Sequence, residues 1–312
     1  MKVFAFDYAE AGGPMGRPVP ASLRRQGSML LHALLADLGA LPDVELITLA
    51  PVCAAGGAQP PFSERFEACL AAADAVWPLA SEPDYLLERL SRQVLRGGRV
   101  LLGSAPAAIR VAASKITTAR ALLAAGVNAV DTYSPQESLP LGEGAWVVKP
   151  DDGAGCLDTR LFSDRGAALT WTRASAAEGY VLQPFVSGKL GSLSMLCRDG
   201  VARVLSRNLE RVAVRDNQFH FLGSTVNGID DADGALERMA QQVAAAIPGL
   251  WGYVGVDFIL TADGPTVLEV NARLTAAYAG LHASLRCNPA GLVIGLLAGT
   301  DLLPEPVANP AC

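Results

Sequence analysis

The sequence GVDFIL at residues 255–260 is followed closely by VLEVNAR at residues 267–273. Each run is mostly apolar, as buried strands are. Between the two runs, Asp263-Gly264 is a turn signal, so we expect the second strand to fold back beside the first. A charged side chain on such a buried strand pair needs a partner, because an unpaired buried charge is costly.

The polar side chains of this strand pair form a candidate metal site. Glu269 and Asn271 are two residues apart and therefore point to one face of their strand, while the turn brings Asp257 near Glu269. Two carboxylates and an amide oxygen are hard ligands suited to Mg²⁺, which completes its shell with water and phosphate oxygens. A nucleoside triphosphate is thus the first ligand to consider. Two alternatives stay open: Asp257 caps a turn, or Glu269 pairs with Arg273.

Composition limits the class of protein. The 312 residues are 51% hydrophobic and 18% charged, enough for two or three compact units and too apolar for a disordered chain. The net charge of -6 argues against a nucleic-acid partner, because phosphate backbones are bound by clustered Lys and Arg. No apolar run reaches membrane-spanning length, and Asp7 comes too early for a secretory signal. The six cysteines lack metal-binding spacing and fit reduced thiols, so we expect a cytoplasmic protein with no membrane partner, and a homodimer as the default for a soluble enzyme.

The first third of the chain alternates predicted strands and helices. Apolar strands in such an alternation predict a parallel sheet covered by helices on both faces, here an α/β unit at residues 1–112. The strands are expected at residues 2–6, 44–49, 75–79 and 100–102, and the helices at residues 22–38, 62–73 and 83–95.

A glycine-rich loop, Gly12 to Gly16, follows the first strand. Ligands bind at the carboxyl ends of strands in open α/β sheets, and Gly12 and Gly13 permit close backbone approach, so we expect a substrate contact here. The loop lacks the fingerprint of a dinucleotide-binding turn or a P-loop. The alternative is a mobile loop without a ligand.

Two lysines are candidates for binding an anion. Lys115 follows Ser114, the N-cap candidate of a helix, where a cation is disfavoured unless an anion meets it. A solvated surface lysine is the alternative. Lys149 ends an apolar strand and leads into the glycine-rich loop at residues 151–156, whose amides can cradle phosphates. Cys156 in that loop is interpreted as a small loop residue rather than a nucleophile.

The second half of the chain is predicted to contain further strands and two helices. Pro184 bends or ends an apolar strand at residues 180–186. A hairpin is expected from residues 192–197 and 201–206, with Asp199-Gly200 between them. Helices are expected at residues 233–247 and 290–297. Four arginines are expected to face either solvent or an anionic substrate. They are Arg203, Arg207, Arg211 and Arg215.

Several motifs occur in one order and together resemble the ATP-grasp superfamily, over about residues 100–280. They are Ser114-Lys115, VVKPDDGAG at 147–155, LQPFVSG at 182–188, GVDF at 255–258 and LEVNAR at 268–273. The resemblance implies an N-terminal parallel α/β domain followed by a two-lobed ATP-grasp domain whose lobes are α+β. The expected division is a first domain at 1–112, a small lobe with the glycine-rich loop at 113–182 and a C-terminal lobe with the metal site at 183–312.

The resemblance also implies roles for single residues. Lys115 and Lys149 would hold the phosphates of ATP, and Lys149 and Arg273 would act in catalysis by neutralising the transferred group. The metal site for one or two Mg²⁺, with Mn²⁺ as an alternative, would be Asp257, Glu269 and Asn271. The phosphate loop and the segment facing adenine would be Gly153, Ala154, Gly155, Gln183, Phe185 and Val186. Substrate contacts are expected at Gly12, Gly13, Asn208 and Arg211.

The function implied by the resemblance is that of an ATP-dependent carboxylate–amine ligase, which forms an amide through an acyl-phosphate and releases ADP and phosphate. The motif QGSML at 26–30, with Gly12-Gly13, is similar to the branch of archaeal tyramine–glutamate ligases in methanofuran cofactor biosynthesis. That branch implies L-glutamate and an amine such as tyramine. Two rival hypotheses are a phosphotransferase on the same fold and a non-catalytic ATP-binding regulatory protein. The second is motivated by Pro184 and Lys189, which stand where acids are common in the family.

Overall fold

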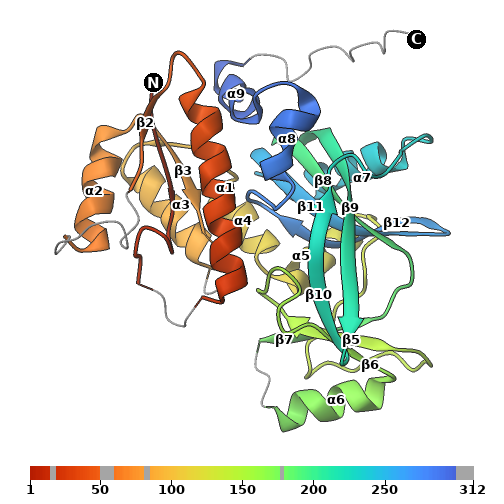
Figure 1. Ribbon diagram of the computed structural model, residues 1–312. Helices are drawn as coiled ribbons and strands as arrows, with labels where there is room; N and C mark the ends of the chain where they lie inside the picture. Colours follow the sequence, from red (N-terminus) through yellow and green to blue (C-terminus); the bar gives the residue numbers. More distant parts are fainter. Residues whose placement is uncertain (15–18, 50–59, 81–84, 176–178, 300–312) are drawn as a thin grey trace.

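The computed structural model describes residues 1–14, 19–49, 60–80, 85–175 and 179–299 (Figure 1). Within these ranges the N-terminal sheet contains four parallel strands in the order β2-β1-β3-β4. The strands are β1 (Lys2–Asp7), β2 (Glu45–Ile47), β3 (Ala75–Leu79) and β4 (Val100–Leu101).

Helices cover both faces of this parallel sheet. They are α1 (Ala21–Gly39), α2 (Phe62–Ala72), α3 (Leu86–Arg96) and α4 (Pro106–Ala112). Side chains of β1 alternate between the two faces: Val3 and Ala5 pack in one apolar cluster with leucines of α1, whereas Phe4 and Phe6 pack in another with α2 and α3. Burial on both faces explains why these strands are continuously apolar. The predicted covered parallel sheet is confirmed.

The later strands form an eight-stranded antiparallel sheet in the order β12-β11-β8-β9-β10-β6-β5-β7. They are β5 (Trp146–Pro150), β6 (Arg160–Phe162), β7 (Tyr180–Pro184), β8 (Lys189–Arg198), β9 (Val201–Arg215), β10 (Gln218–Thr225), β11 (Gly252–Thr261) and β12 (Gly264–Asn271). Both predicted hairpins, β8–β9 and β11–β12, are confirmed. Pro184 is the last residue of an edge strand, where the missing N–H breaks no ladder.

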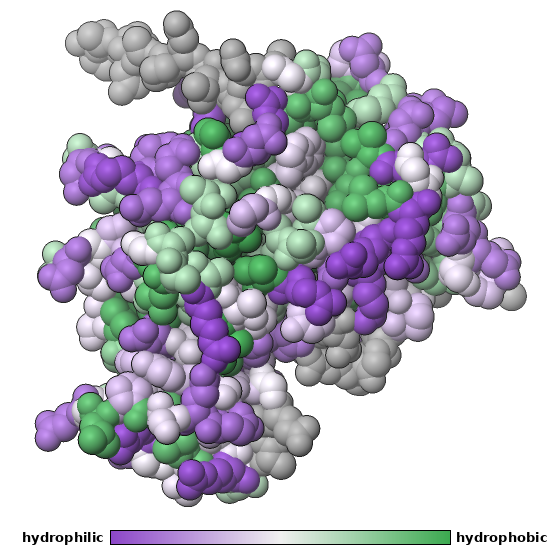
Figure 2. Space-filling view, turned by 180° about the vertical axis from the view of Figure 1, so that it is seen from behind, coloured by the Kyte–Doolittle hydropathy of each residue, from purple (hydrophilic) through white to green (hydrophobic). Residues whose placement is uncertain are grey.

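One end of this sheet forms a separate lobe. Strands β5, β6 and β7 and helix α6 (Arg165–Ala174) project below the main body in Figure 1, and again in the view from behind in Figure 2. The long ribbon of β9 and β10 connects the lobe to the body, since Gln218 of β10 pairs with Arg160 of β6. The predicted division of the chain at residues 112 and 182 stays a prediction.

Helices α5 (Lys115–Ala124) and α7 (Ala235–Ala246) lie against the antiparallel sheet. The Ser114 hydroxyl accepts a hydrogen bond from the amide of Thr117 at 3.2 Å, which is the predicted N-cap of α5. Because this cap fixes where α5 begins, it also fixes Lys115 in the first turn of the helix.

The C-terminal helices connect the two sheets. Helices α8 (Tyr278–Leu285) and α9 (Pro289–Gly295), with the short 3-10 helix η3 (Leu296–Ala298), pack beside α1 (Figure 1). Buried Asp37 of α1 accepts hydrogen bonds from the Tyr278 hydroxyl at 2.8 Å and, at its carbonyl, from the Asn288 amide at 2.7 Å. These contacts join the N-terminal unit to the rest of the protein.

The structure adds elements that the sequence pattern did not predict. Helices α4, α6 and α8 and strands β6 and β10 are absent from the prediction. Helix α3 is described only from Leu86, so its predicted start at residue 83 lies outside the described residues. Residues 15–18, Cys53 and Cys312 also lie outside them. Among the helices that the structure describes, none combines the length and apolar character needed to cross a lipid bilayer.

Candidate active site

The β11–β12 hairpin brings the predicted metal ligands together. Asp257 lies directly opposite Glu269 across the two strands, and Gly255 lies opposite Asn271. The carboxyl groups of Asp257 and Glu269 share a hydrogen bond, and the Asn271 amide donates to Asp257 Oδ2 at 3.4 Å. The alternative in which Asp257 caps a turn is wrong, because Asp257 lies inside β11.

Two buried lysines face these acids. Lys115 Nζ lies 3.3 Å from Glu269 Oε2, so the ion pair of Glu269 is formed with Lys115. The same ammonium donates to the carbonyl oxygens of Gly153 at 2.7 Å and Asp151 at 3.2 Å. Lys149, at the end of β5, is also buried. The alternative of a solvated surface lysine at position 115 is therefore wrong.

Burial and mutual charge shift the pKa values of this cluster. Burial raises the pKa of Asp257 well above its usual value, and the neighbouring Glu269 carboxylate adds to the effect. Burial also acts to raise the pKa of Glu269, but the Lys115 and Lys149 ammonium groups outweigh it and lower that pKa to about 2. Burial lowers the pKa of Lys149 to about 8, although Glu269 opposes this change. Burial and the Glu269 carboxylate thus favour the protonated form of Asp257, whereas the two lysines favour the charged form of Glu269.

This donor set suits a divalent cation. Two buried carboxyl groups in direct contact repel each other when both are charged, so they favour either a proton or a cation between them. Two carboxylates and the Asn271 amide oxygen are hard ligands of the kind that Mg²⁺ prefers. No cluster of three or more His, Cys, Asp or Glu side chains suited to a metal occurs in the described part of the chain, so the amide is needed to complete this set.

A cavity of about 370 Å³, the large cavity, contains all of these groups. Twelve of the sixteen predicted site residues line it, and the structure thus brings them together: Lys115, Lys149, Gly153, Ala154, Gly155, Gln183, Phe185, Val186, Asp257, Glu269, Asn271 and Arg273. Apolar side chains from strands β5, β7, β8, β9, β10, β11 and β12 form much of the remaining wall. An apolar wall beside a cluster of cations and carboxylates suits a ligand with a flat ring at one end and phosphates at the other.

The glycine-rich loop lies against this cavity. Gly155 has a φ of +64°, which favours glycine, and a Cβ at Gly153 would lie 3.0 Å from Pro150 Cβ. Cys156 also lines the cavity, and burial raises the pKa of its thiol to about 11. A thiol that stays protonated is a poor nucleophile, in agreement with its interpretation as a small loop residue.

Four predicted substrate contacts do not line the large cavity. Asn208 is fully buried, and its amide donates a hydrogen bond to Ser192 Oγ at 3.2 Å. Since Ser192 lines the large cavity, Asn208 lies directly behind the cavity wall. Arg211 is exposed on β9, and Gly12 and Gly13 lie in the loop after β1. The ring of Tyr8 lies 2.5 Å from where a Cβ of Gly13 would be, which is a packing reason for that glycine.

Sequence reasoning missed Glu210. Its carboxylate lines the large cavity, accepts hydrogen bonds from the hydroxyls of Ser192 at 2.5 Å and Ser224 at 3.0 Å, and contributes to the raised pKa of Asp257. Its Oε2 atom is buried without a hydrogen-bond partner. The sequence does place Glu210 two residues after Asn208, and therefore on the same face of a strand as that candidate site residue. The neighbouring arginines, Arg207 and Arg211, make this pattern hard to recognise.

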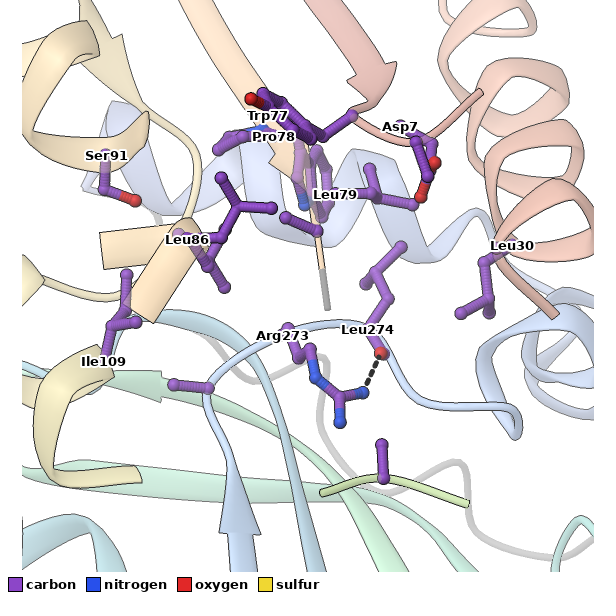
Figure 3. Close-up of a pocket in the computed structure, with 18 of the residues that line it drawn as sticks. Asp7, Leu30, Trp77, Pro78, Leu79, Leu86, Ser91, Ile109, Arg273 and Leu274 are labelled. Atoms are coloured by element: carbon purple, nitrogen blue, oxygen red, sulfur yellow. Dashed lines mark hydrogen bonds between the residues drawn. The ribbon is translucent and has the colours of Figure 1, made fainter. Parts of the chain in front are cut away.

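A second cavity, of about 90 Å³, lies between the parallel sheet and the segment after β12 (Figure 3). We call it the interdomain cavity. Asp7 and Leu79 enter it from the ends of β1 and β3, while Arg273 and Leu274 enter from the opposite side. Gln26, Ala154 and Arg273 line both cavities, so these residues form the boundary between the two.

Two known families match consecutive parts of the chain. A family described as the pre ATP-grasp 3 domain matches residues 40–109, and one described as the ATP-grasp domain matches residues 112–277. The second match covers more than half of the chain.

Curated relatives are similar over part of their length. The tyramine–L-glutamate ligase of Methanocaldococcus jannaschii is 28% identical over 206 residues, which are 66% of this chain and 58% of that protein. The phosphoribosylamine–glycine ligase of Mycobacterium tuberculosis is 26% identical over 289 residues, 78% of this chain and 65% of that protein. The chain thus spans less than two thirds of the length of these relatives.

Solved structures share the fold. A putative ATP-grasp superfamily protein from Archaeoglobus fulgidus aligns with a TM-score of 0.72 and 23% identity, over 95% of this chain and 88% of that one. The D-alanine–D-alanine ligase from Bacillus anthracis complexed with ATP aligns with a TM-score of 0.67 and 15% identity, over 96% of this chain and 97% of that one.

Proposed function

Because this chain belongs to the ATP-grasp superfamily, we propose that it is an ATP-dependent ligase that joins a carboxylate to an amine. One observation carries the proposal. The large cavity gathers two lysines, two carboxyl groups and an amide around one point, and Arg273 extends from there to the interdomain cavity. A nucleotide and a second substrate can therefore meet at Arg273.

The protein's own groups suit the charge of a nucleoside triphosphate. Lys115 and Lys149 supply two positive charges from two elements, α5 and β5, and the loop at Gly153–Gly155 supplies backbone amides. Asp257, Glu269 and Asn271 would hold Mg²⁺, or Mn²⁺ in its place. The cation would neutralise phosphate charge as it accumulates during phosphoryl transfer.

The proposed reaction solves a leaving-group problem. A carboxylate cannot release oxide, so one carboxylate oxygen first attacks the γ-phosphorus of ATP and ADP departs. The amine nitrogen then attacks the acyl carbon, phosphate leaves, and the nitrogen loses its surplus protons to give the amide. Arg273 and Lys149 would neutralise the acyl-phosphate and the transition state that leads to it. Arg273 is held in position by bonds to Asn271 Oδ1 at 2.9 Å and to the Leu274 carbonyl at 3.2 Å.

The substrates are proposed from the relatives. The similarity to tyramine–L-glutamate ligase makes L-glutamate the first acid to test and tyramine the first amine, as in methanofuran-type cofactor biosynthesis. The similarity to phosphoribosylamine–glycine ligase makes glycine the second acid to test.

Nucleotide analysis tests the proposal. The purified protein is incubated with ATP, Mg²⁺, one acid and one amine from a panel, and the nucleotide products are separated by chromatography. We expect ADP that depends on both the acid and the amine, and no such ADP from the Glu269→Gln variant. Production of AMP would overturn the acyl-phosphate mechanism. ATP binding without turnover across the panel would favour the non-catalytic alternative, and a phosphorylated acid without amide would favour a phosphotransferase.

A further inference from the structure

Three buried oxygen atoms on one face of β9 have no hydrogen-bond partner. They belong to Ser206, Asn208 and Glu210, which alternate along the strand and therefore point to the same side of the sheet. The unpartnered atoms are Ser206 Oγ, Asn208 Oδ1 and Glu210 Oε2. The Ser206 and Asn208 side chains are almost completely buried. Native proteins rarely leave such atoms unpaired, so each of them calls for an ion or a bound water molecule.

Hydrogen bonds join Asn208 and Glu210 through the neighbouring strands β8 and β10, which lie on either side of β9 (Figure 1). The Asn208 amide donates to Ser192 Oγ at 3.2 Å and to Ser194 Oγ at 3.3 Å, so both of its N–H groups are used and its oxygen can only accept. The Ser192 hydroxyl donates to Glu210 Oε1 at 2.5 Å, and the Ser224 hydroxyl donates to the same atom at 3.0 Å. The hydrogen atoms are thus consumed within the group, and oxygen acceptors remain. We call four of these side chains the oxygen cluster: Ser192, Asn208, Glu210 and Ser224.

The Glu210 carboxylate brings a negative charge to the oxygen cluster. Among the described residues, its hydrogen-bond donors are the hydroxyls of Ser192 and Ser224, and neither carries a charge. Burial raises the pKa of this carboxyl group, and the two hydroxyls offset that effect only in part. Ser192 lies directly opposite Asp257 across β8 and β11, and the charge of Glu210 contributes to the raised pKa of Asp257. A carboxylate in this position needs a positive charge from outside the protein.

The chemistry of the oxygen cluster favours a monovalent cation. The cluster offers one carboxylate, one amide oxygen and two hydroxyl oxygens, and so a single negative charge. Potassium ions are bound in proteins by neutral oxygen dipoles that replace the hydration shell. Mg²⁺ gives up its water reluctantly and is held by carboxylates and phosphates, as the site at Asp257 and Glu269 provides. The two sets of ligands therefore suit different ions.

We propose that the oxygen cluster binds a monovalent cation, K⁺ or Na⁺, in the wall of the large cavity. Glu210 and Ser192 line that cavity, and Asn208 lies behind them. The cation neutralises Glu210, which otherwise repels a triphosphate bound in the same cavity. The cation site is independent of the proposed ligase function, whereas its effect on nucleotide binding rests on that function.

Thermal unfolding without nucleotide tests the site itself. The melting temperature is measured in EDTA with about 0.1 M KCl, NaCl or tetramethylammonium chloride, so that the ionic strength is constant and the third cation is too large to bind. Glu210→Gln removes the charge with little change of shape, and Ser224→Ala removes one hydroxyl ligand. Control variants are Glu143→Gln and Ser175→Ala, whose side chains are exposed and lie outside both cavities. Each protein is compared with itself between salts, so differences in intrinsic stability cancel.

We expect K⁺ or Na⁺ to raise the melting temperature of wild type and of both controls by about 2–5 °C relative to tetramethylammonium, as a ligand does at about 10 to 100 times its Kd. Glu210→Gln should show no difference between the salts, and Ser224→Ala a smaller one than wild type. Calorimetry of ATP binding with Mg²⁺ tests the link to the nucleotide. The affinity of wild type should be about tenfold higher in the stabilising salt than in tetramethylammonium chloride, and that of Glu210→Gln should be the same in both.

The outcomes that overturn the inference differ from those that overturn the ligase function. Equal melting temperatures of wild type in all three salts refute the cation site and assign the unpartnered oxygens to buried water. An equal rise in wild type and Glu210→Gln refutes the assignment of the site to this cluster. A rise in melting temperature with an ATP affinity that does not depend on the salt refutes the link to the nucleotide. A rise without any ATP binding supports the cation site and refutes the ligase function.

Discussion

Replacing Asp7 by Asn is expected to stabilise the ligand-free protein at neutral and alkaline pH. Asp7 is only 9% exposed, and burial raises the pKa of its carboxyl group from the usual 3.8 to about 6. The folded protein therefore holds this proton more tightly than the unfolded chain does. Above its folded pKa, ionised Asp7 lowers the free energy of unfolding, and a neutral Asn side chain avoids this destabilisation.

The size and the sign of the effect follow from the two pKa values. Between 3.8 and about 6 lie about 2 pKa units, which correspond to about 3 kcal/mol at 1.36 kcal/mol per unit. Below pH 3.8 the carboxyl group is protonated in both states and contributes nothing. As the pH rises from 3.8 to about 6, the unfolded chain loses the proton first, and the free energy of unfolding falls. Above about pH 6 the full destabilisation is present.

Urea unfolding of wild type and Asp7→Asn at about pH 5 and about pH 8 measures this difference, because the contributions of all other groups cancel between the two proteins. The free energy of unfolding of Asp7→Asn should exceed that of wild type by about 3 kcal/mol at the higher pH and by less at the lower pH. A difference that does not change with pH would refute the reasoning, as would a variant that is less stable than wild type at pH 8.

Three other predictions concern the β11–β12 hairpin and the buried lysine Lys149. Glu269→Gln removes one carboxylate of the metal site and should lower ADP formation by about 100-fold or more. A wild-type rate would contradict the metal assignment. Lys149 loses its proton as the pH rises through about 8, so ATP affinity measured by calorimetry should fall about fivefold from pH 8 to pH 9. Lys149→Arg should show no such fall, and a parallel fall in that variant would exclude this lysine as the cause. Gly255→Ala places a Cβ 2.4 Å from Thr275 Cγ2 and should lower the free energy of unfolding in urea by about 1–3 kcal/mol. The control Gly39→Ala has nothing within 4 Å of the added Cβ and should be neutral or stabilising. Equal effects of the two substitutions would reject the steric explanation.

The β11–β12 hairpin is the part of the candidate site that the sequence predicts most directly. Alternation along a strand puts Glu269 and Asn271 on one face, and a turn at Asp263-Gly264 leaves few ways to pair the strands, so Asp257 opposite Glu269 follows from local rules. The place of Lys149 also follows from local sequence, because this residue lies at the end of the strand that leads into the glycine-rich loop.

The rest of the site depends on contacts between distant parts of the chain. Lys115 is buried because carbonyl oxygens of Asp151 and Gly153 reach its ammonium group across 36 and 38 residues of sequence, and no local pattern records that. The interdomain cavity has the same origin, since Asp7 and Ser91 come from one unit and Arg273 from the other. Helix α4 escapes prediction because its seven residues are too few for a helical period to be recognised.

Arg273 lies at the boundary between the two cavities, which is where the proposed reaction would bring its substrates together. Arg273 is tied on one side to Asn271, a proposed metal ligand, and on the other to the backbone of Leu274, which lines the interdomain cavity. A substrate carboxylate paired with this guanidinium would lie at the boundary of both cavities, close to the proposed metal and phosphate site. Gln26 of α1 and Ala154 of the glycine-rich loop complete the boundary from two other elements. In the proposed reaction, the acyl-phosphate would then be made and consumed at one position beside Arg273, which holds the reacting groups close together.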